Sequence, residues 1–229
     1  MSKKPVFILL LGLFFLSPLV AEEDKTIVRS VTTAQMKFLR AVDNKYQKKH
    51  GIHIKLKKLI TLGVLGSSKE STGEAWLDNG KMRLEIQKPE PSKIIADKQF
   101  LWIESPPPKD FKDGKTQVLR ASLNSDRAKN QGLIQLLTRG GVLKYFKVSG
   151  IQSDEKTITY FLQPDKQALE FKRAQIVITT DKKEIKELRY WDQMDNETTF
   201  TFLDTTFDQK LPKDLFNYNP PKDAEVITY

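Results

Sequence analysis

The sequence contains no cysteine among its 229 residues. That absence excludes a disulfide framework, thiolate metal sites and cysteine nucleophiles. It also leaves no cysteine that could carry a lipid anchor. The folded chain must therefore be held together by the packing of its core, and a chain of this length can form one sizeable domain.

Recognisable patterns of enzyme sites are missing as well. There is no G-x-S-x-G, H-E-x-x-H or G-x-x-x-x-G-K-[ST] motif in the chain. The only histidines, His50 and His53, should lie on opposite faces of a strand, exposed to solvent and unable to share a metal. Acidic residues are abundant, so the sequence does not exclude a glycosidase-like pair of carboxylates, but it singles out no such pair. We expect no enzyme activity, no catalytic residue, no metal and no cofactor.

The sequence lacks a long apolar run after its first 21 residues, and no later stretch reaches the ~20 residues of a membrane-spanning helix. Residues 1–21 begin with Lys3 and Lys4, continue through an apolar run at 6–16 and end in small residues. This order is typical of a secretory signal peptide. We therefore expect a leader at 1–21 and an exported, soluble chain at 22–229.

Basic residues outnumber acidic ones, and the formal net charge is +9. For an exported protein this excess favours anionic lipid or an acidic protein as a partner. A nucleic-acid platform would need aromatic residues between the basic ones, but Lys55, Lys57 and Lys58 are interleaved with aliphatic residues. We expect no nucleic-acid binding. The three lysines are instead predicted to form part of a basic docking face.

A helical period appears first, from about residue 27 to 49, where apolar residues recur every three or four positions. The stretch from Thr32 to Gln35 has capping-box spacing and marks a start or a restart. A second helical stretch, Asp126 to Arg139, ends at Gly140. The apolar side of each helical stretch can pack either against the protein's own core or against a ligand.

From residue 51 the period changes to two, which indicates strands with one apolar face. Further stretches of this kind lie near residues 73–78, 81–87, 92–96, 99–104, 115–121, 144–149, 156–162, 170–179, 184–192 and 197–203. Turn residues separate them, and the chain closes with an extended stretch at 214–221. No linker divides the chain. The pattern predicts a single domain, built as an antiparallel meander of ten or eleven strands.

The predicted sheet has one large apolar face. If Met82, Leu84 and Ile86 point one way, then the residues between them point to water. Such a face has to be covered, and the two helical stretches are available as covers. The result is either a filled core or a cavity with a lid, because barrels of eight or more strands begin to have room for a ligand.

Several short motifs follow one another in a particular order. They are Gly73-Glu74-Ala75-Trp76-Leu77, Met82-Arg83-Leu84-Glu85, Ile94-Ile95-Ala96-Asp97 followed by Leu101-Trp102, Leu162-Gln163-Pro164, the stretches 171–178 and 188–202, and Phe216-Asn217-Tyr218-Asn219-Pro220-Pro221. In this order and spacing they resemble the LolA-type family of outer-membrane lipoprotein carriers over nearly all of residues 22–229.

The resemblance implies an incomplete antiparallel β-barrel with a lid of two or three helices and an apolar cavity. It implies a monomeric periplasmic carrier that receives acylated lipoproteins from an inner-membrane ABC-type transporter and hands them to an outer-membrane receptor or membrane. The implied lipid-binding residues are Trp76, Met82, Leu84, Ile86 and Trp102 in the sheet, and Leu133, Leu136 and Leu137 on the lid. For each of them, ordinary core packing is the competing interpretation.

The sequence departs from the family at one turn. The family commonly has an Arg-Pro pair after the Trp-bearing strand, and that arginine is implicated in holding the lid and passing cargo. Here the turn is Asp78-Asn79-Gly80, and the nearest arginine, Arg83, should point away from Met82 and Leu84. Two other functions stay open: a related barrel that binds another lipid, such as a glycolipid or a sterol-like compound, and an envelope-stress sensor domain that binds a regulator.

Overall fold

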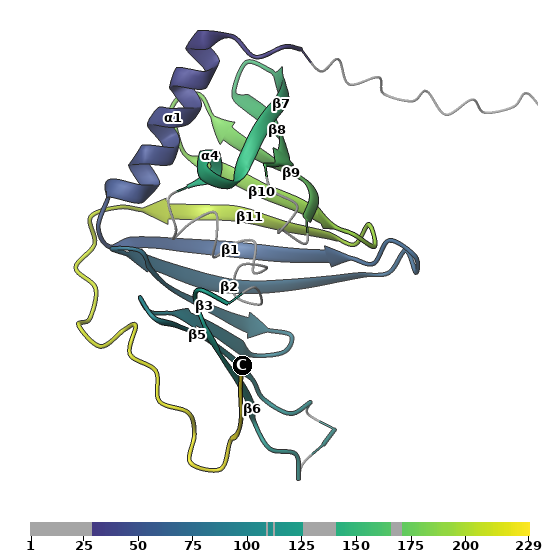
Figure 1. The fold of residues 1–229 in the computed structure, drawn as a ribbon, viewed down its shortest axis with the longest axis vertical. Coiled ribbons are helices and arrows are strands. Elements are labelled where there is room, and N and C mark those ends of the chain that lie inside the picture. The colour runs from purple at the N-terminus through teal and green to yellow at the C-terminus, as the bar shows by residue number, and fades with distance from the viewer. Residues whose placement is uncertain (1–28, 109, 112, 126–140, 166–170) are drawn as a thin grey trace, which may run out of the picture.

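The computed structural model describes residues 29–108, 110–111, 113–125, 141–165 and 171–229, and in them one twelve-stranded sheet dominates (Figure 1). Its strands are β1 (Ile52–Thr61), β2 (Ser68–Asp78), β3 (Lys81–Lys88), β4 (Ser92–Ala96), β5 (Phe100–Ser105), β6 (Gln117–Ser122), β7 (Phe146–Ser153), β8 (Thr157–Pro164), β9 (Phe171–Thr179), β10 (Ile185–Asp192), β11 (Glu197–Thr206) and β12 (Glu225–Thr228). They lie in the order β12-β6-β5-β4-β3-β2-β1-β11-β10-β9-β8-β7.

The sheet is an open, incomplete barrel, which confirms the predicted fold class. Every neighbouring pair runs antiparallel except β12 and β6, which are parallel. The twelfth strand was not predicted, because the expected extended end at 214–221 is not a strand and the chain pairs only afterwards, at Glu225–Thr228. Turns of the expected kind join the antiparallel strands. Asn79 and Gly80 both have positive φ between β2 and β3, as a two-residue hairpin requires.

The first helix, α1 (Thr33–Lys48), begins later than the periodicity suggested. Thr32 is its N-cap, and its side chain and that of Gln35 form the reciprocal bonds of a capping box. The prediction of a helix start at this motif is therefore confirmed, and the earlier start near residue 27 is wrong. Arg29 instead pairs with Ile151 of β7 through two backbone hydrogen bonds.

A short helix, α4 (Val142–Tyr145), contacts α1 and β7. The carboxylate of Asp43 on α1 accepts hydrogen bonds from the backbone amides of Val142 (3.0 Å) and Leu143 (3.5 Å). Gly141 precedes them with φ of +81°, and a Cβ there would come within 2.1 Å of the Asp43 carboxylate. A glycine is therefore required for α4 to approach α1. The predicted helix at 126–139 lies outside the described residues.

The sheet separates two clusters of buried side chains. We call the face toward α1 the inner face; its main core joins Leu39 and Val42 of α1 to the strands. On the other, outer face, Ile95 and Val118 are also fully buried, yet they do not belong to that core. No helix in the described residues is long and apolar enough to cross a membrane. Each predicted lipid-binding residue therefore has to be assigned to the inner or to the outer face.

Candidate ligand-binding face

Three of the predicted lipid-binding residues lie together on the inner face. Met82, Leu84 and Ile86 of β3 are exposed by only 0%, 2% and 8%, and all three belong to the main core. Phe200 and Phe202 of β11 also face inward. The alternation read from the sequence therefore places the inner face correctly on these strands. Whether the residues contact lipid stays a prediction.

The two tryptophans do not join them, so the prediction that all five sheet residues share one face is wrong. Trp76 pairs with Arg83, and Trp102 lies in the same cross-strand row as Arg83. Since directly paired residues project from the same side of a sheet, both tryptophans are on the outer face. The predicted lid residues, Leu133, Leu136 and Leu137, lie outside the described residues, and their lipid contact stays a prediction.

The outer tryptophans are covered by side chains that the sequence pattern did not single out for this role. His53 stacks on Trp76 with ring centres 5.2 Å apart, and its Nε2 lies 2.6 Å from the Glu74 carboxylate. The side chain of His53 is only 17% exposed, so the prediction that this histidine is solvent-exposed is wrong. His50 is exposed, as predicted. No group of three metal-ligating side chains occurs within the described ranges.

Residues 207–224, which we call the C-terminal segment, cross the outer face of β3 to β6 (Figure 1). Arg83 donates to the Leu215 carbonyl at 2.9 Å, and the Tyr218 hydroxyl donates to Glu104 at 2.7 Å. The Tyr218 ring also contacts Trp102, with centres 5.4 Å apart. Burial, together with the hydrogen bond to the Glu104 carboxylate, raises the pKa of the Tyr218 hydroxyl. Arg83 is therefore held on the outer face, as the alternation predicted, and the turn at 78–80 supplies no arginine to the inner face.

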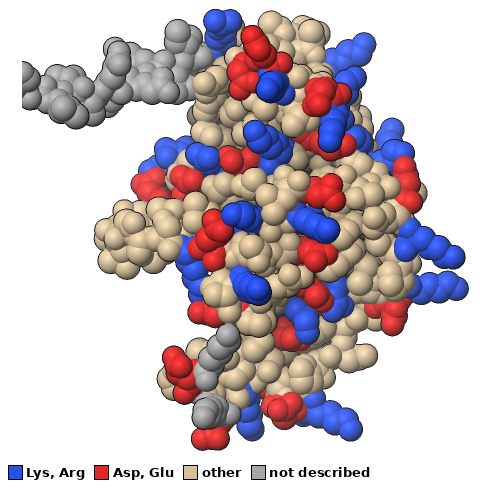
Figure 2. Space-filling view, turned by 180° about the vertical axis from the view of Figure 1, so that it is seen from behind, with Lys and Arg blue, Asp and Glu red and all other residues tan. Residues whose placement is uncertain are grey.

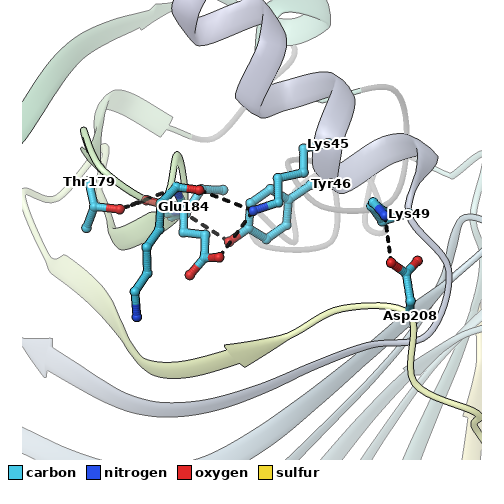
Figure 3. A network of polar contacts seen from close by, with 8 residues as sticks. Lys45, Tyr46, Lys49, Thr179, Glu184 and Asp208 are labelled. Carbon is cyan, nitrogen blue, oxygen red and sulfur yellow. Dashed lines mark hydrogen bonds and ion pairs between the residues drawn. The ribbon is translucent and has the colours of Figure 1, made fainter.

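The inner face is covered over the β8–β11 half of the sheet by α1. Tyr160 of β8 donates its hydroxyl to the Gln35 carbonyl at 2.8 Å, and burial raises its pKa to about 12. At the other end of α1, the Tyr46 hydroxyl accepts from the Ile185 amide at 3.2 Å (Figure 3). Beside it, Lys45 forms an ion pair with Glu184 at 3.1 Å. The helix is thus fixed to the sheet at both ends.

Over β3 to β6 the inner face is less completely covered. Leu84 pairs with Ile94, which pairs with Ile103, which pairs in turn with Leu119. Leu84 is buried, whereas the other three side chains are only half-buried. Aliphatic side chains in one row that keep part of their surface accessible are available to an apolar ligand. The sequence pointed to Leu84 but gave no reason to single out its three neighbours.

The charged residue Lys58 also lies on the inner face. Lys58 pairs with Ser71 on one side and with Phe200 on the other, so its side chain projects inward. Lys57 and Lys58 are neighbours in a strand, so they project to opposite sides of the sheet. The prediction that Lys58 forms one basic face with Lys55 and Lys57 is therefore wrong. On the face shown in Figure 2, basic and acidic side chains are interspersed instead of forming a uniformly basic surface.

Comparison with known proteins identifies a family that this chain matches over most of its length. A family model described as outer membrane lipoprotein carrier protein LolA matches residues 25–219. A search of the curated proteins gave no match.

Solved structures of similar fold share little sequence with this chain. An uncharacterized conserved protein from Thermus thermophilus has a TM-score of 0.50 at 11% identity, covering 86% of this chain and 99% of that one. A LolA superfamily protein from Nitrosomonas europaea has a TM-score of 0.46 at 11% identity, covering 82% and 99%. The complex of MucA and MucB from Pseudomonas aeruginosa gives 0.38 at 12% identity, covering 80% and 60%. At these identities, likeness shows the fold alone.

Proposed function

This chain belongs to the outer membrane lipoprotein carrier family, and on that basis we propose that it carries acylated lipoproteins through the periplasm. It would take its cargo from an inner-membrane ABC-type transporter and deliver it to an outer-membrane receptor or to the membrane itself. The role is one of binding and release, without a catalytic step or a cofactor. A carrier of this kind would be exported behind a leader at residues 1–21 and would act as a monomer.

The physical need for a carrier is large. Each buried methylene contributes about 0.8 kcal/mol, so an acyl chain of about 15 methylenes costs on the order of 12 kcal/mol in water. A lipoprotein with several such chains cannot cross an aqueous compartment unaided at a useful rate. A carrier has to offer apolar surface that is accessible to the chain and that does not collapse into a solid core.

The observation that carries the proposal is the row of half-buried aliphatic side chains on β4, β5 and β6. Ile94, Ile103 and Leu119 stand beside the fully buried Leu84 on the inner face, and each keeps part of its surface accessible. Together with Met82 and Ile86, they would contact the hydrocarbon chains. Family membership supports the same role.

The proposal can be tested with a pair of aspartate variants on one hairpin. Ile103→Asp places a charge in the half-buried row, whereas Gln99→Asp places the same charge in the exposed turn between β4 and β5. We expect Ile103→Asp to weaken binding of a triacylated lipopeptide by at least about tenfold, because an acyl chain cannot solvate a carboxylate. Gln99→Asp should bind like the wild type. Binding would be measured by fluorescence titration, with the folded state checked by circular dichroism.

Cargo recovery separates this proposal from its alternatives. The protein purified from periplasm should carry triacylated lipoprotein and keep that lipoprotein soluble on dilution from detergent. Extraction of a glycolipid or a sterol-like compound instead would favour a related barrel with another ligand. A regulator that co-purifies with a lipid-free protein would favour the sensor domain. Equal lipopeptide affinity in the two aspartate variants would contradict the choice of the inner face.

A further inference from the structure

Lys58 is a cation in apolar surroundings on the inner face. On its own strand it lies between Leu56 and Ile60, which project to the same side. Across the sheet it stands in one row with Phe200, Leu188, Ile176, Tyr160 and Ile151, each at most 2% exposed. The ammonium group is thus placed at the end of a buried apolar row.

Within the described part of the chain, Lys58 has no carboxylate partner. Its Nζ lies 5.8 Å from the centre of the Phe200 ring, and its neighbour across β2 is the hydroxyl residue Ser71. Burial, with a smaller contribution from the positive charge of Lys69, lowers the pKa of Lys58. Lys69 itself forms an ion pair with Glu90 at 2.5 Å. A half-buried ammonium without a counter-ion is costly for a folded protein, and a ligand can supply the missing charge.

The row of half-buried aliphatic residues lies on the same face of the sheet as this cation, further along the strands and three strands away. Leu56 and Ile54 project from β1 on the same side as Lys58, two and four residues before it. Ile54 pairs with Ala75 of β2, Ala75 pairs with Leu84 of β3, and Leu84 pairs with Ile94 of β4. The inner face therefore offers a cation at one side and an accessible apolar row at the other. That arrangement matches an amphiphile, with one charged group and a hydrocarbon chain.

We propose that Lys58 binds the anionic group of an amphiphilic ligand, a carboxylate or a phosphate, while the hydrocarbon chain of that ligand lies along the inner face. The inference rests on the proposed function, because it takes the inner face as the lipid-binding face. It adds a chemical class to the ligand, since a neutral acyl ester would make no use of Lys58. Charge-assisted hydrogen bonds to a phosphate or a carboxylate are the strongest that a lysine makes.

Three probes with the same oleoyl chain test the proposal: oleate, oleoyl lysophosphatidic acid and the neutral monooleoylglycerol. The wild type should bind the anionic probes more tightly than the neutral one. In Lys58→Met, we expect affinity for an anionic probe to fall roughly tenfold to a hundredfold, with no change for monooleoylglycerol. The anionic probe that loses more identifies the carboxylate or the phosphate as the preferred group. Lys58→Arg, which keeps the charge, should retain most of the preference.

Lys57→Met is the matched control. The substitution is the same and the position is adjacent, but Lys57 lies on the outer face and pairs with Glu70 at 3.1 Å. It should leave the affinity for all three probes unchanged. If Lys57→Met and Lys58→Met behave alike, or if Lys58→Met weakens all three probes equally, Lys58 does not recognise an anionic group. If the wild type binds the triacylated lipopeptide but none of these probes, the inference fails and the proposed function stands. If the wild type binds neither the lipopeptide nor the probes, the proposed function fails as well.

Thermal melting without ligand gives a second readout. Because Lys58→Met removes a desolvated charge that has no partner, the melting temperature of the variant should equal or exceed that of the wild type. A clear decrease would mean that Lys58 already has an anionic partner inside the protein. That result would overturn the proposal, because the ammonium would then not be available to a ligand.

Discussion

The two halves of the sheet are buried from opposite sides. Over β8 to β11, α1 covers the inner face, and Tyr160 joins the sheet directly to the helix backbone. Over β3 to β6, the C-terminal segment covers the outer face, where Ile95 and Val118 are fully buried. On the inner face of that half, Met82, Leu84 and Ile86 of β3 are buried as well, but Ile94, Ile103 and Leu119 of the next three strands remain half-buried.

This difference shows that the alternation of a strand does not tell whether its apolar face serves as core or as a binding surface. Both halves consist of the same kind of antiparallel strand, and both bury a row of aliphatic residues. The half whose inner face is packed against α1 is structural core. In the other half, the C-terminal segment also stabilises the strands from the outer face, so that the inner side chains of β4 to β6 need not all be buried. A half of this kind can bind a ligand without losing its fold.

Leu39→Ala should have the largest effect, on the half covered by α1. Leu39 is fully buried between α1 and the sheet, and its truncation should lower the free energy of unfolding by about 4 kcal/mol. Arg40→Ala, at an exposed neighbouring position, should change it by less than about 0.5 kcal/mol. Urea denaturation measures both. Similar losses for the two variants would mean that α1 does not complete the core.

Phe216→Ala should have the largest effect on the other half. Phe216 is 5% exposed within the C-terminal segment, and we expect its truncation to cost about 3 kcal/mol. Hydrogen exchange should accelerate in β4 to β6 and stay slow in β8 to β10. The exposed Asn217 provides the control, Asn217→Ala, which should leave both regions protected. Hydrogen exchange that accelerates equally in all strands would show that the two halves of the sheet are not stabilised separately.

Tyr218→Phe removes a single contact between the C-terminal segment and the sheet. Glu104 is only 7% exposed and loses the hydroxyl donor at 2.7 Å, while its ion pair with Lys93 remains. We expect a loss of about 1.5 kcal/mol, as for a hydrogen bond to a charged group. A double-mutant cycle with Glu104→Gln should give a coupling energy of similar size. Additive losses would show that the bond does not hold the segment in place.

Asp43→Asn should have the smallest effect, visible as a change with pH. Burial is the main cause that raises the pKa of Asp43 above 3.8, against the backbone bonds from Val142 and Leu143. Above pH 3.8 the native state therefore keeps a proton that the unfolded state has lost. The contribution of this group to stability is complete below pH 3.8 and is lost as the pH rises through the raised value. Asparagine keeps an acceptor oxygen but has no such titration.

The measurement is the difference in unfolding free energy between wild type and Asp43→Asn from about pH 3 to about pH 7. The wild type should lose stability relative to the variant as the pH rises. Parallel curves would show that the Asp43 carboxyl has its ordinary pKa, and that the contact between α1 and α4 is more solvated than the structure indicates.

Much of the fold could be predicted, because its signals are local. Alternation identified the eleven antiparallel strands, and the capping box at Thr32 identified the true start of α1. The strand β12 escaped prediction because its parallel pairing with β6 depends on a contact more than a hundred residues away in the sequence. Of the site, Met82, Leu84 and Ile86 were predicted on the inner face, whereas Trp76 and Trp102 were assigned to the wrong face.

The amino-acid sequence by itself determined the strands, their turns and the partition of each strand into two faces. It could not determine which face becomes the interior where both are apolar, as at Ile94-Ile95 and Leu101-Trp102. A period of two is the same seen from either side, so the choice depends on what packs against the strand. The tertiary structure made that choice by placing α1 on the inner face of one half and the C-terminal segment on the outer face of the other.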